Sequence, residues 1–380
     1  MERINLMIPG PVEVEYDVLS EMGLPVVAHY GSEWVKIYNE TLNYLKQIFQ
    51  TKSDVFIIVG SGSAGLDAAI GSLSGNHNKI LVLTNGYFGD RLVAITRSYT
   101  DKVAILKTKW NRPIPSDDVR EFLKKEKGIK AIAMVHNETS TGILNPIKEV
   151  GQILSEFNIL FMVDAVSSLG GEKLKMDEWG IDICVTASQK CLGSPPGLAL
   201  VALNQKAWNT IEKQRNSFHG WYLNLRTWKE YAKKWADWHP YPITMAVNNI
   251  LALRIALKKI LAEGLDKRVA RHANIAKIVR TGLQNMGFNM VSNETYLSNV
   301  MTAVLTIPGT SPKEIMNFLR TKYRIQIAGG VGELKGKIFR IGHMGPAASL
   351  NSIIPVMFGI EDYLRGKGFK IPCGASLKGV

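Results

Sequence analysis

The chain has 380 residues, 46% of them hydrophobic and 21% charged, which is typical of a globular protein with a sizeable core. No apolar run approaches the roughly 20 residues that a membrane-spanning helix needs, and no signal-peptide pattern opens the chain, so we expect a cytoplasmic protein without membrane association. The net charge is +13, but the basic residues are spread along the chain and form no recognisable nucleic-acid module, so we expect anionic small molecules rather than nucleic acid as partners.

The first two-thirds of the chain alternate short apolar runs with amphipathic stretches, the pattern of a βαβ sheet. Most of the runs are uniformly apolar, as expected when helices cover both faces of a sheet. We therefore predict an α/β fold whose large domain has a mostly parallel, seven-stranded sheet sandwiched by helices. The predicted strands are residues 55–59, 79–84, 103–107, 131–136, 160–164, 183–187 and 198–203, and the predicted helices are residues 63–73, 89–99, 116–126 and 146–157.

The last third of the chain has a different texture. Residues 208–241 are rich in Trp, Tyr, Lys and His and predict irregular helices, followed by a long helix that continues beyond Gly264. The remaining pattern predicts a smaller C-terminal α+β domain. The predicted helices are residues 245–261, 268–286, 312–323 and 350–364, and the predicted strands are residues 300–307 and 337–341. The predicted divisions are an N-terminal arm (1–20), a large domain (21–255), a small domain (256–370) and a tail (371–380).

A glycine-rich loop follows the first predicted strand of the large domain, with the sequence Gly60-Ser61-Gly62-Ser63-Ala64-Gly65. Such a loop lets the backbone approach an anion at a helix N-terminus. The loop matches the GxGxxG pattern of dinucleotide sites, but the next strand ends in Thr84-Asn85-Gly86 without the acid that binds a ribose. A monophosphate is therefore the better ligand, and an NAD-dependent oxidoreductase is the weaker alternative.

Two charged residues follow later strands. Asp164 ends an apolar strand, where open α/β sheets bind ligands, although it could also simply cap the next turn. Lys190 follows another strand, among small and polar residues, and a desolvated amine there can attack carbonyls. A phosphate cradle, a carboxylate and a lysine at one sheet edge are the groups that pyridoxal phosphate requires.

The chain resembles the class V (fold-type I) pyridoxal-phosphate enzymes of the serine–pyruvate / alanine–glyoxylate aminotransferase family from Pro9 to about Phe369. The motifs that carry the resemblance are Gly60-Ser61-Gly62-Ser63, Asn85-Gly86-Tyr87-Phe88-Gly89-Asp90-Arg91, His136-Asn137-Glu138-Thr139-Ser140-Thr141-Gly142, Asp164-Ala165-Val166-Ser167-Ser168-Leu169-Gly170-Gly171, Ser188-Gln189-Lys190 and Phe339-Arg340-Ile341-Gly342.

The resemblance implies a role for each matching residue. Lys190 is the expected Schiff-base lysine and Asp164 the partner of the pyridine nitrogen. The phosphate would be held by Ser61, Gly62, Ser63 and Gln189, and the ring by Val166, Thr139 and Phe88. Phe88 stands where the family often has Trp, and Ser63 where it has His, so the ring keeps a stacking partner of smaller area and the phosphate contact at residue 63 is open.

Three further residues complete the implied site. Tyr241 and Thr244 fall where the family reaches into the neighbouring active site of a homodimer, although Tyr241 could also be an ordinary aromatic loop residue. Arg340 lies within an apolar strand, an expensive place for a guanidinium unless it binds a carboxylate. The resemblance implies that it binds the substrate carboxylate, and a structural ion pair is the alternative.

The implied activity is transamination of a serine- or alanine-type donor with a 2-oxo acid such as pyruvate or glyoxylate, ping-pong through pyridoxamine phosphate. A kynurenine-type transaminase shares the same cofactor residues. A cysteine desulfurase needs a mobile nucleophilic Cys, whereas Cys191 directly follows Lys190 and Cys373 lies near the C-terminus. The third cysteine is Cys184, and the three show neither CxxC nor metal-ligand spacing, so we expect free thiols and no metal site.

Overall fold

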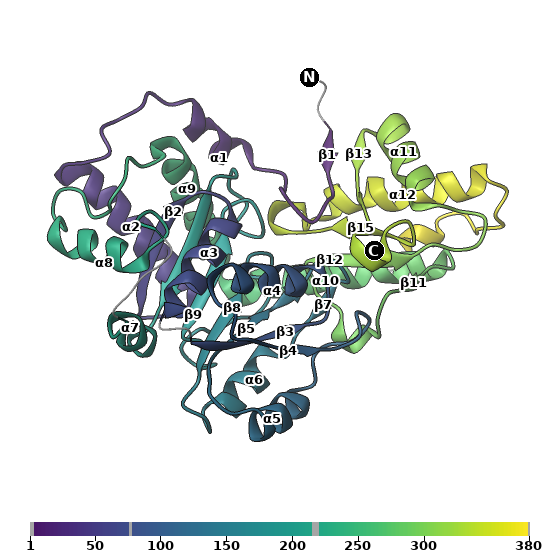
Figure 1. The fold of residues 1–380 in the computed structure, drawn as a ribbon. Coiled ribbons are helices and arrows are strands. Elements are labelled where there is room, and N and C mark those ends of the chain that lie inside the picture. The colour runs from purple at the N-terminus through teal and green to yellow at the C-terminus, as the bar shows by residue number, and fades with distance from the viewer. Residues whose placement is uncertain (1–3, 76–77, 215–219, 379–380) are drawn as a thin grey trace.

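A computed structural model describes residues 4–75, 78–214 and 220–378, and a seven-stranded sheet forms its centre (Figure 1). In order across the sheet, the strands are β2 (Asp54–Val59), β10 (Leu198–Leu203), β9 (Ile183–Ala187), β8 (Leu160–Asp164), β5 (Ile129–Val135), β3 (Lys79–Thr84) and β4 (Val103–Lys107). All neighbouring pairs are parallel except those that β10 makes with β2 and β9. The predicted mostly parallel seven-stranded sheet is therefore confirmed.

Helices cover both faces of this sheet, which explains why strands such as β8 and β10 are apolar and buried throughout. On one face α3 packs against β9 and β10 and α4 against β3, while α6 packs against β8 on the other (Figure 1). The helices of this part are α1 (Tyr16–Ser20), α2 (Ser32–Phe49), α3 (Gly62–Leu73), α4 (Tyr87–Tyr99), α5 (Ser116–Lys125), α6 (Ile147–Leu154), α7 (Gln205–Glu212) and α8 (Leu225–Lys234).

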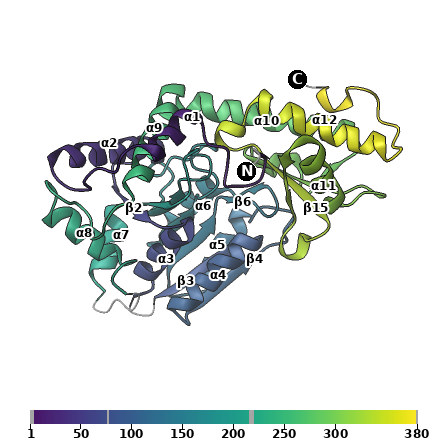
Figure 2. The same cartoon turned by 90° about the horizontal axis from the view of Figure 1, so that it is seen from above.

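Two long helices, α9 (Val247–Glu263) and α10 (Leu265–Asn285), lead into the last part of the chain (Figure 2). The predicted continuation is broken at Gly264, whose φ of 84° is a conformation that ends a helix and that glycine adopts without strain. The chain after this break folds on a second sheet with strand order β11-β12-β15-β14. Its elements are β11 (Asn289–Met290), β12 (Met301–Leu305), α11 (Pro312–Tyr323), β14 (Ala328–Gly329), β15 (Ile338–Gly342) and α12 (Leu350–Gly366).

The N-terminal segment joins this second sheet region although it begins the chain. Strand β1 (Asn5–Leu6) pairs in parallel with β13 (Ile325–Gln326), and the amide of Gly342 donates to the carbonyl of Met7 at 2.8 Å. The side chain of Met7 is fully buried in the apolar cluster of the C-terminal elements. Residues 5–7 are thus attached to the C-terminal part of the fold, while the amide of Val12 donates to the carbonyl of Gln189, just after β9.

The buried apolar residues form two large clusters. The first surrounds the seven-stranded sheet and includes residues from Trp34 to Ile260, and the second includes Met7 and residues from Ile275 to Ala375. Among the described helices, none is long and apolar enough to cross a membrane.

Candidate active site

The loop after β2 forms a tight cradle at the start of α3. Ser61 is the N-cap of this helix, so Gly62 and Ser63 lie in its first turn. A Cβ at Gly62 would lie 3.1 Å from Cγ2 of Val166 and 3.1 Å from Cβ of Ala187, so a side chain there would crowd both neighbours. The first-turn N–H groups and the positive end of the helix dipole are therefore available to an anion.

Asp164 lies at the end of β8 and is only 6% exposed. Its Oδ1 accepts a hydrogen bond from the Val166 amide at 2.9 Å, so it does cap the following turn. Within the described residues, no donor reaches Oδ2. Burial raises the pKa of Asp164 to about 6, and the Glu138 carboxylate adds to this, while Arg91 and Lys190 oppose it. A cationic partner at Oδ2 would bring the carboxylate back to its charged form.

Lys190 follows β9, and its Nζ donates to the backbone carbonyl of Pro9 in the N-terminal segment. The amine also lies close to Gly10, where an added Cβ would be 2.4 Å from Nζ. Burial and the charge of Arg340 together lower the pKa of Lys190 to about 8, against the opposing effect of Asp164. A large fraction of the amine is therefore neutral at mildly alkaline pH, the form that attacks carbonyls and accepts protons.

These groups line one cavity of about 240 Å³. The residues expected from the sequence that line it are Ser61, Gly62, Ser63, Phe88, Thr139, Asp164, Val166, Gln189 and Lys190. The remaining lining residues are Leu66, Arg91, Val135, Asn137 and Ser167. The glycine loop, the carboxylate and the lysine thus meet at the carboxyl ends of neighbouring strands, as the strand order requires.

None of these five remaining residues was given a role by the sequence, and three of them, Arg91, Asn137 and Ser167, are polar. Arg91 lies over the Phe88 ring, 4.8 Å from its centroid. The Asn137 side chain donates to the Ser167 hydroxyl at 3.0 Å. Each residue stands inside a motif that carried the family resemblance, so its position was visible, but its contact with the cavity depends on a partner elsewhere in the chain.

Glu138 does not line the cavity, but it positions Phe88 in the cavity wall, and no role was assigned to it from the sequence. Its fully buried carboxylate accepts hydrogen bonds at 3.0 Å from the amides of Phe88 and Gly89, and its other oxygen accepts from the Ser140 hydroxyl at 2.6 Å. Burial raises its pKa, and these four donors, which include the Ser140 amide, oppose the rise. The bonds begin α4 at Tyr87, two residues before the predicted start, and fix Phe88 at the cavity wall.

Arg340 lies on β15 and is 8% exposed. Its Nε donates to the carbonyl of Gly329 at 2.8 Å and its Nη1 to the carbonyl of Thr139 at 2.9 Å. Among the residues that the structure describes, no carboxylate lies within ion-pairing distance of it. The guanidinium is therefore held by neutral acceptors, which leaves its charge available to a carboxylate ligand.

Tyr241 and Thr244 do not line the cavity. Tyr241 is fully buried in its own chain, where its hydroxyl donates to the carbonyl of His29 and accepts from the Trp34 indole. Thr244 is exposed. The expected contact with a neighbouring active site stays a prediction for both residues, and the placement of Tyr241 does not favour it.

The cavity fits pyridoxal phosphate. Side chains at Gly62 would fill the cradle, and Oε1 of Gln189 and Oδ1 of Asn137 are buried without a hydrogen-bond donor in the described part of the chain. Gln189, Asn137 and Asp164 all line a cavity that also contains a lysine of lowered pKa. A ligand with an anionic end, a ring nitrogen and an aldehyde has a partner for each group.

Comparison with known proteins agrees with this fit. The family model of the class-V aminotransferases matches residues 16–334. The chain is 40% identical to an uncharacterized aminotransferase of Methanocaldococcus jannaschii, over 96% of this chain and 94% of that protein. It is 32% identical to alanine–glyoxylate aminotransferase 1 of Saccharomyces cerevisiae, over 95% and 97% of the two chains.

A solved structure gives the same result. The ureidoglycine–glyoxylate aminotransferase of Bacillus subtilis superimposes with a TM-score of 0.94 at 32% identity, covering all of this chain and 97% of the other. The chain therefore belongs to the class-V aminotransferases and is a pyridoxal-phosphate-dependent aminotransferase.

Proposed function

We propose that the enzyme transfers the amino group of a small amino acid, of the serine or alanine type, to a 2-oxo acid such as glyoxylate or pyruvate. The observation that carries the proposal is Arg340, a buried guanidinium without an acidic partner among the described residues, close enough to Lys190 to lower its pKa. Both substrates have a carboxylate next to the reacting carbon. The names of the yeast relative and the Bacillus structure, which both include glyoxylate, support the acceptor.

In this proposal the first turn of α3 and Gln189 hold the phosphate, and Lys190 holds the cofactor covalently. Val166 and Phe88 would enclose the ring, Thr139 would bond its phenolic oxygen, and the Asp164 carboxylate would keep its nitrogen protonated. Bound in this way, the cofactor supplies a ring that withdraws electrons from the substrate Cα. The buried Asp164 is suited to this task, because a charged partner restores the carboxylate that burial disfavours.

Lys190 then acts as the proton carrier. Its neutral Nζ would take the proton from the substrate Cα, and the charge of Arg340 on the substrate carboxylate would hold Cα within reach. The Pro9 carbonyl, which already accepts from Nζ, keeps the released amine near the cavity instead of letting it rotate to solvent.

The test is a panel of amino donors and 2-oxo acids with the purified holoenzyme, followed by the absorbance of the cofactor. Serine or alanine should convert the cofactor to its amine form, and glyoxylate or pyruvate should restore it. A preference for kynurenine over both donors would replace the proposal with the kynurenine-type alternative, which shares all cofactor residues.

The desulfurase alternative has little support. Cys191 is fully buried, its Sγ donates to the Ser167 carbonyl at 3.2 Å, and burial raises its pKa to about 12. Cys373 is exposed but follows α12 near the C-terminus. Release of sulfide from cysteine at a rate near that of transamination would reverse this conclusion.

We also propose that the enzyme is a homodimer. The N-terminal segment from α1 to the start of α2 exposes large apolar side chains over a short stretch, and Tyr30 there packs against the exposed Trp238. The exposed members are Tyr16, Leu19, Met22, Leu24, Val26, Val27 and Tyr30. An exposed apolar surface of this kind is typical of an interface, and Thr244 is free to reach a neighbour's site. Light scattering of the wild type against Val26→Asp tests the proposal, which fails if both are monomers.

The domain limits and the location of the protein remain proposals of the same kind. The two buried clusters support a division near the proposed limits of 21–255 and 256–370, but the first cluster continues to Ile260 and the second includes Met7 of the arm and Ala375 of the tail. Residues 1–3, 379 and 380 lie outside the described part. Limited proteolysis would test the limits. The two buried cysteines are free thiols, which agrees with the cytoplasm, and cell fractionation tests it.

A further inference from the structure

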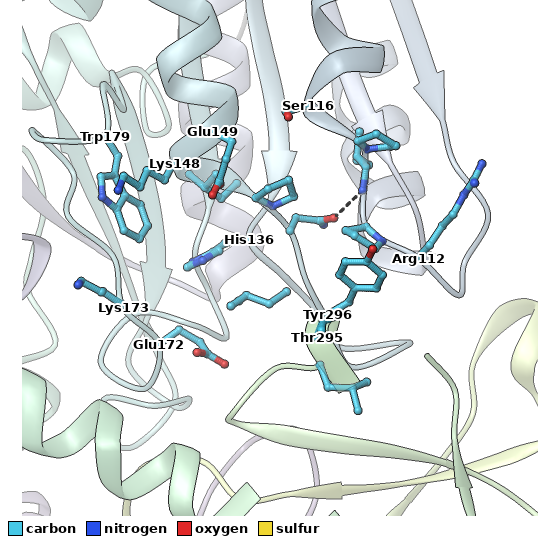
Figure 3. Close-up of a pocket in the computed structure, with 18 of the residues that line it drawn as sticks. Arg112, Ser116, His136, Lys148, Glu149, Glu172, Lys173, Trp179, Thr295 and Tyr296 are labelled. Carbon is cyan, nitrogen blue, oxygen red and sulfur yellow. Dashed lines mark hydrogen bonds between the residues drawn. The ribbon is translucent and has the colours of Figure 1, made fainter. Parts of the chain in front are cut away.

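A second cavity, of about 740 Å³ (Figure 3), is larger than the active-site cavity. His136, Trp179 and Glu172, from loops that follow strands of the large sheet, line it, and in Figure 3 Tyr296 of the C-terminal part lies across from Trp179. Val269 of the C-terminal part also lines the cavity. Its volume is in the range of ligand-binding pockets, which are about 300–1,000 Å³. None of the proposed catalytic groups lines it.

The deep part of this cavity, which we call the acceptor floor, consists of His136, Glu172 and Trp179. The three side chains are 2%, 4% and 9% exposed. In Figure 3 the His136 ring lies between Trp179 and Glu172, and its ring is perpendicular to that of Trp179 with the centroids 6.3 Å apart. Apolar side chains surround the floor; they are Leu144, Pro146, Ile147 and Leu297.

His136 brings an unpartnered polar atom to the floor. Its Nδ1 bonds the Ser168 hydroxyl at 3.0 Å, while Nε2 has no hydrogen-bond partner among the described residues. Burial lowers the pKa of His136 to about 3, so the ring is neutral. The bond to Ser168 fits either tautomer of the neutral ring, and a ligand that donates at Nε2 selects the tautomer whose proton lies on Nδ1 and points to Ser168.

Glu172 brings a carboxylate without a cationic partner. Its carboxylate accepts from the backbone amide of Asn299, from the Asn299 side chain at 3.0 Å, and from the Ser298 side chain. Within the described residues, no Lys or Arg side chain is within ion-pairing distance; the charge of Arg280 acts on Glu172, but Arg280 donates to the Ser298 carbonyl. Burial raises the pKa of Glu172 to about 7. A carboxylate has about four acceptor sites, so about one position remains for a ligand.

Glu172 and Nε2 of His136 can therefore both accept hydrogen bonds from one ligand. An anionic ligand beside Glu172 would meet a like charge in a poorly hydrated space. The exposed rim does not decide whether the ligand is a cation or an anion, because it carries Asp117 and Glu149 as well as Arg112, Lys148 and Lys173. The Trp179 face adds an aromatic surface, which attracts cations.

We propose that this cavity binds a small organic cation, an amidinium or ammonium group with N–H donors on a planar apolar body. The cation would donate to Glu172 and to Nε2 of His136, and its body would lie against Trp179 and the aliphatic wall. An amidinium suits these two groups, because one of its N–H groups can donate to the remaining site on Glu172 and another to Nε2 of His136.

The test uses three probes of nearly equal shape and different charge: benzamidine, benzamide and benzoate. None is a substrate amine, so the binding to holoenzyme can be measured by calorimetry at pH 8.5, where Glu172 is ionised. Benzamidine should bind saturably, and at least tenfold more tightly than benzamide or benzoate. Equal affinity for benzamide, tighter binding of benzoate, or no saturable binding of benzamidine would overturn the proposal.

Three variants test whether benzamidine binds in this cavity. Glu172→Gln should lower the affinity for benzamidine at least tenfold, while the matched change Glu178→Gln, at an exposed residue paired with Lys175, should leave it within twofold. Val269→Trp fills the cavity from the C-terminal part without a charge change and should also abolish binding, which covers the case in which Glu172→Gln does not fold. Unchanged affinity in Val269→Trp would show that benzamidine binds elsewhere.

Discussion

Arg340→Lys tests the proposed substrate contact most directly. Arg340 uses Nε and Nη1 on the carbonyls of Gly329 and Thr139, at 2.8 and 2.9 Å, and has Nη2 left for a carboxylate. A lysine keeps the charge but cannot span both carbonyls and the substrate with one ammonium group. Loss of one charge-assisted hydrogen bond to the substrate costs about 1.5–3 kcal/mol.

Since 1.4 kcal/mol corresponds to a factor of ten, kcat/KM for alanine should fall roughly 10- to 150-fold. The assay follows the cofactor absorbance after the enzyme is mixed with alanine or with ethylamine, which has no carboxylate. The rate with ethylamine should change less than threefold. The matched control is Arg320→Lys, at an exposed position on α11.

The reasoning would be wrong if both amines lost the same factor, because the variant would then have disturbed the cavity rather than a carboxylate contact. It would also be wrong if alanine reacted as fast with Arg340→Lys as with the wild type.

The other predictions concern Lys190, its neighbour Gly10 and the buried Glu172. Covalent capture of pyridoxal phosphate by the apoenzyme, measured by absorbance, should accelerate as the pH rises through about 8 and then level off, because the pKa of Lys190 is lowered to about 8 and the neutral amine attacks; a flat profile from pH 7 to 9 would contradict this. Lys190→Ala should abolish both capture and turnover. Gly10→Ala should slow capture at least tenfold, since its Cβ would lie 2.4 Å from Nζ of Lys190 and its φ is +97°, whereas Gly23→Ala, which meets nothing within 4 Å, should not. The pKa of Glu172 is raised to about 7 in the fold from an ordinary 4.5, so the folded state binds the proton more tightly and this group's contribution to stability falls as the pH rises from about 4.5 to 7. At 1.36 kcal/mol per pKa unit the change is roughly 3 kcal/mol, and urea unfolding of Glu172→Gln should show a smaller loss over this range than the wild type.

Much of the fold follows from local pattern. The strands of the large sheet are uniformly apolar because helices cover both faces, and Asp164 and Lys190 follow two such strands, so their meeting could be inferred from strand ends alone. What local pattern could not supply are the contacts between distant segments. Helix α4 begins at Tyr87 because Glu138 binds its first amides from 49 and 50 residues away.

Tyr241 illustrates the same limit. Its position in the motif implied a contact with a second subunit, but its hydroxyl is satisfied by His29 and Trp34, more than 200 residues earlier in the chain. The acceptor floor is another case. His136 and Asn137 belong to the same motif of the family resemblance. Asn137 lines the active site, whereas His136 lines the other cavity, and the sequence does not reveal this division.

The pairing of β1 with β13 has a consequence for synthesis of the enzyme. Residues 5 and 6 leave the ribosome about 320 residues before their partners, residues 325 and 326. At about 5–20 residues per second, the segment that carries Pro9 waits roughly 16 to 64 seconds for its strand partner. During that time the large sheet can form, but Lys190 lacks the carbonyl that holds its amine. A nascent chain arrested before residue 325 should therefore contain a folded sheet and an unfinished cofactor site.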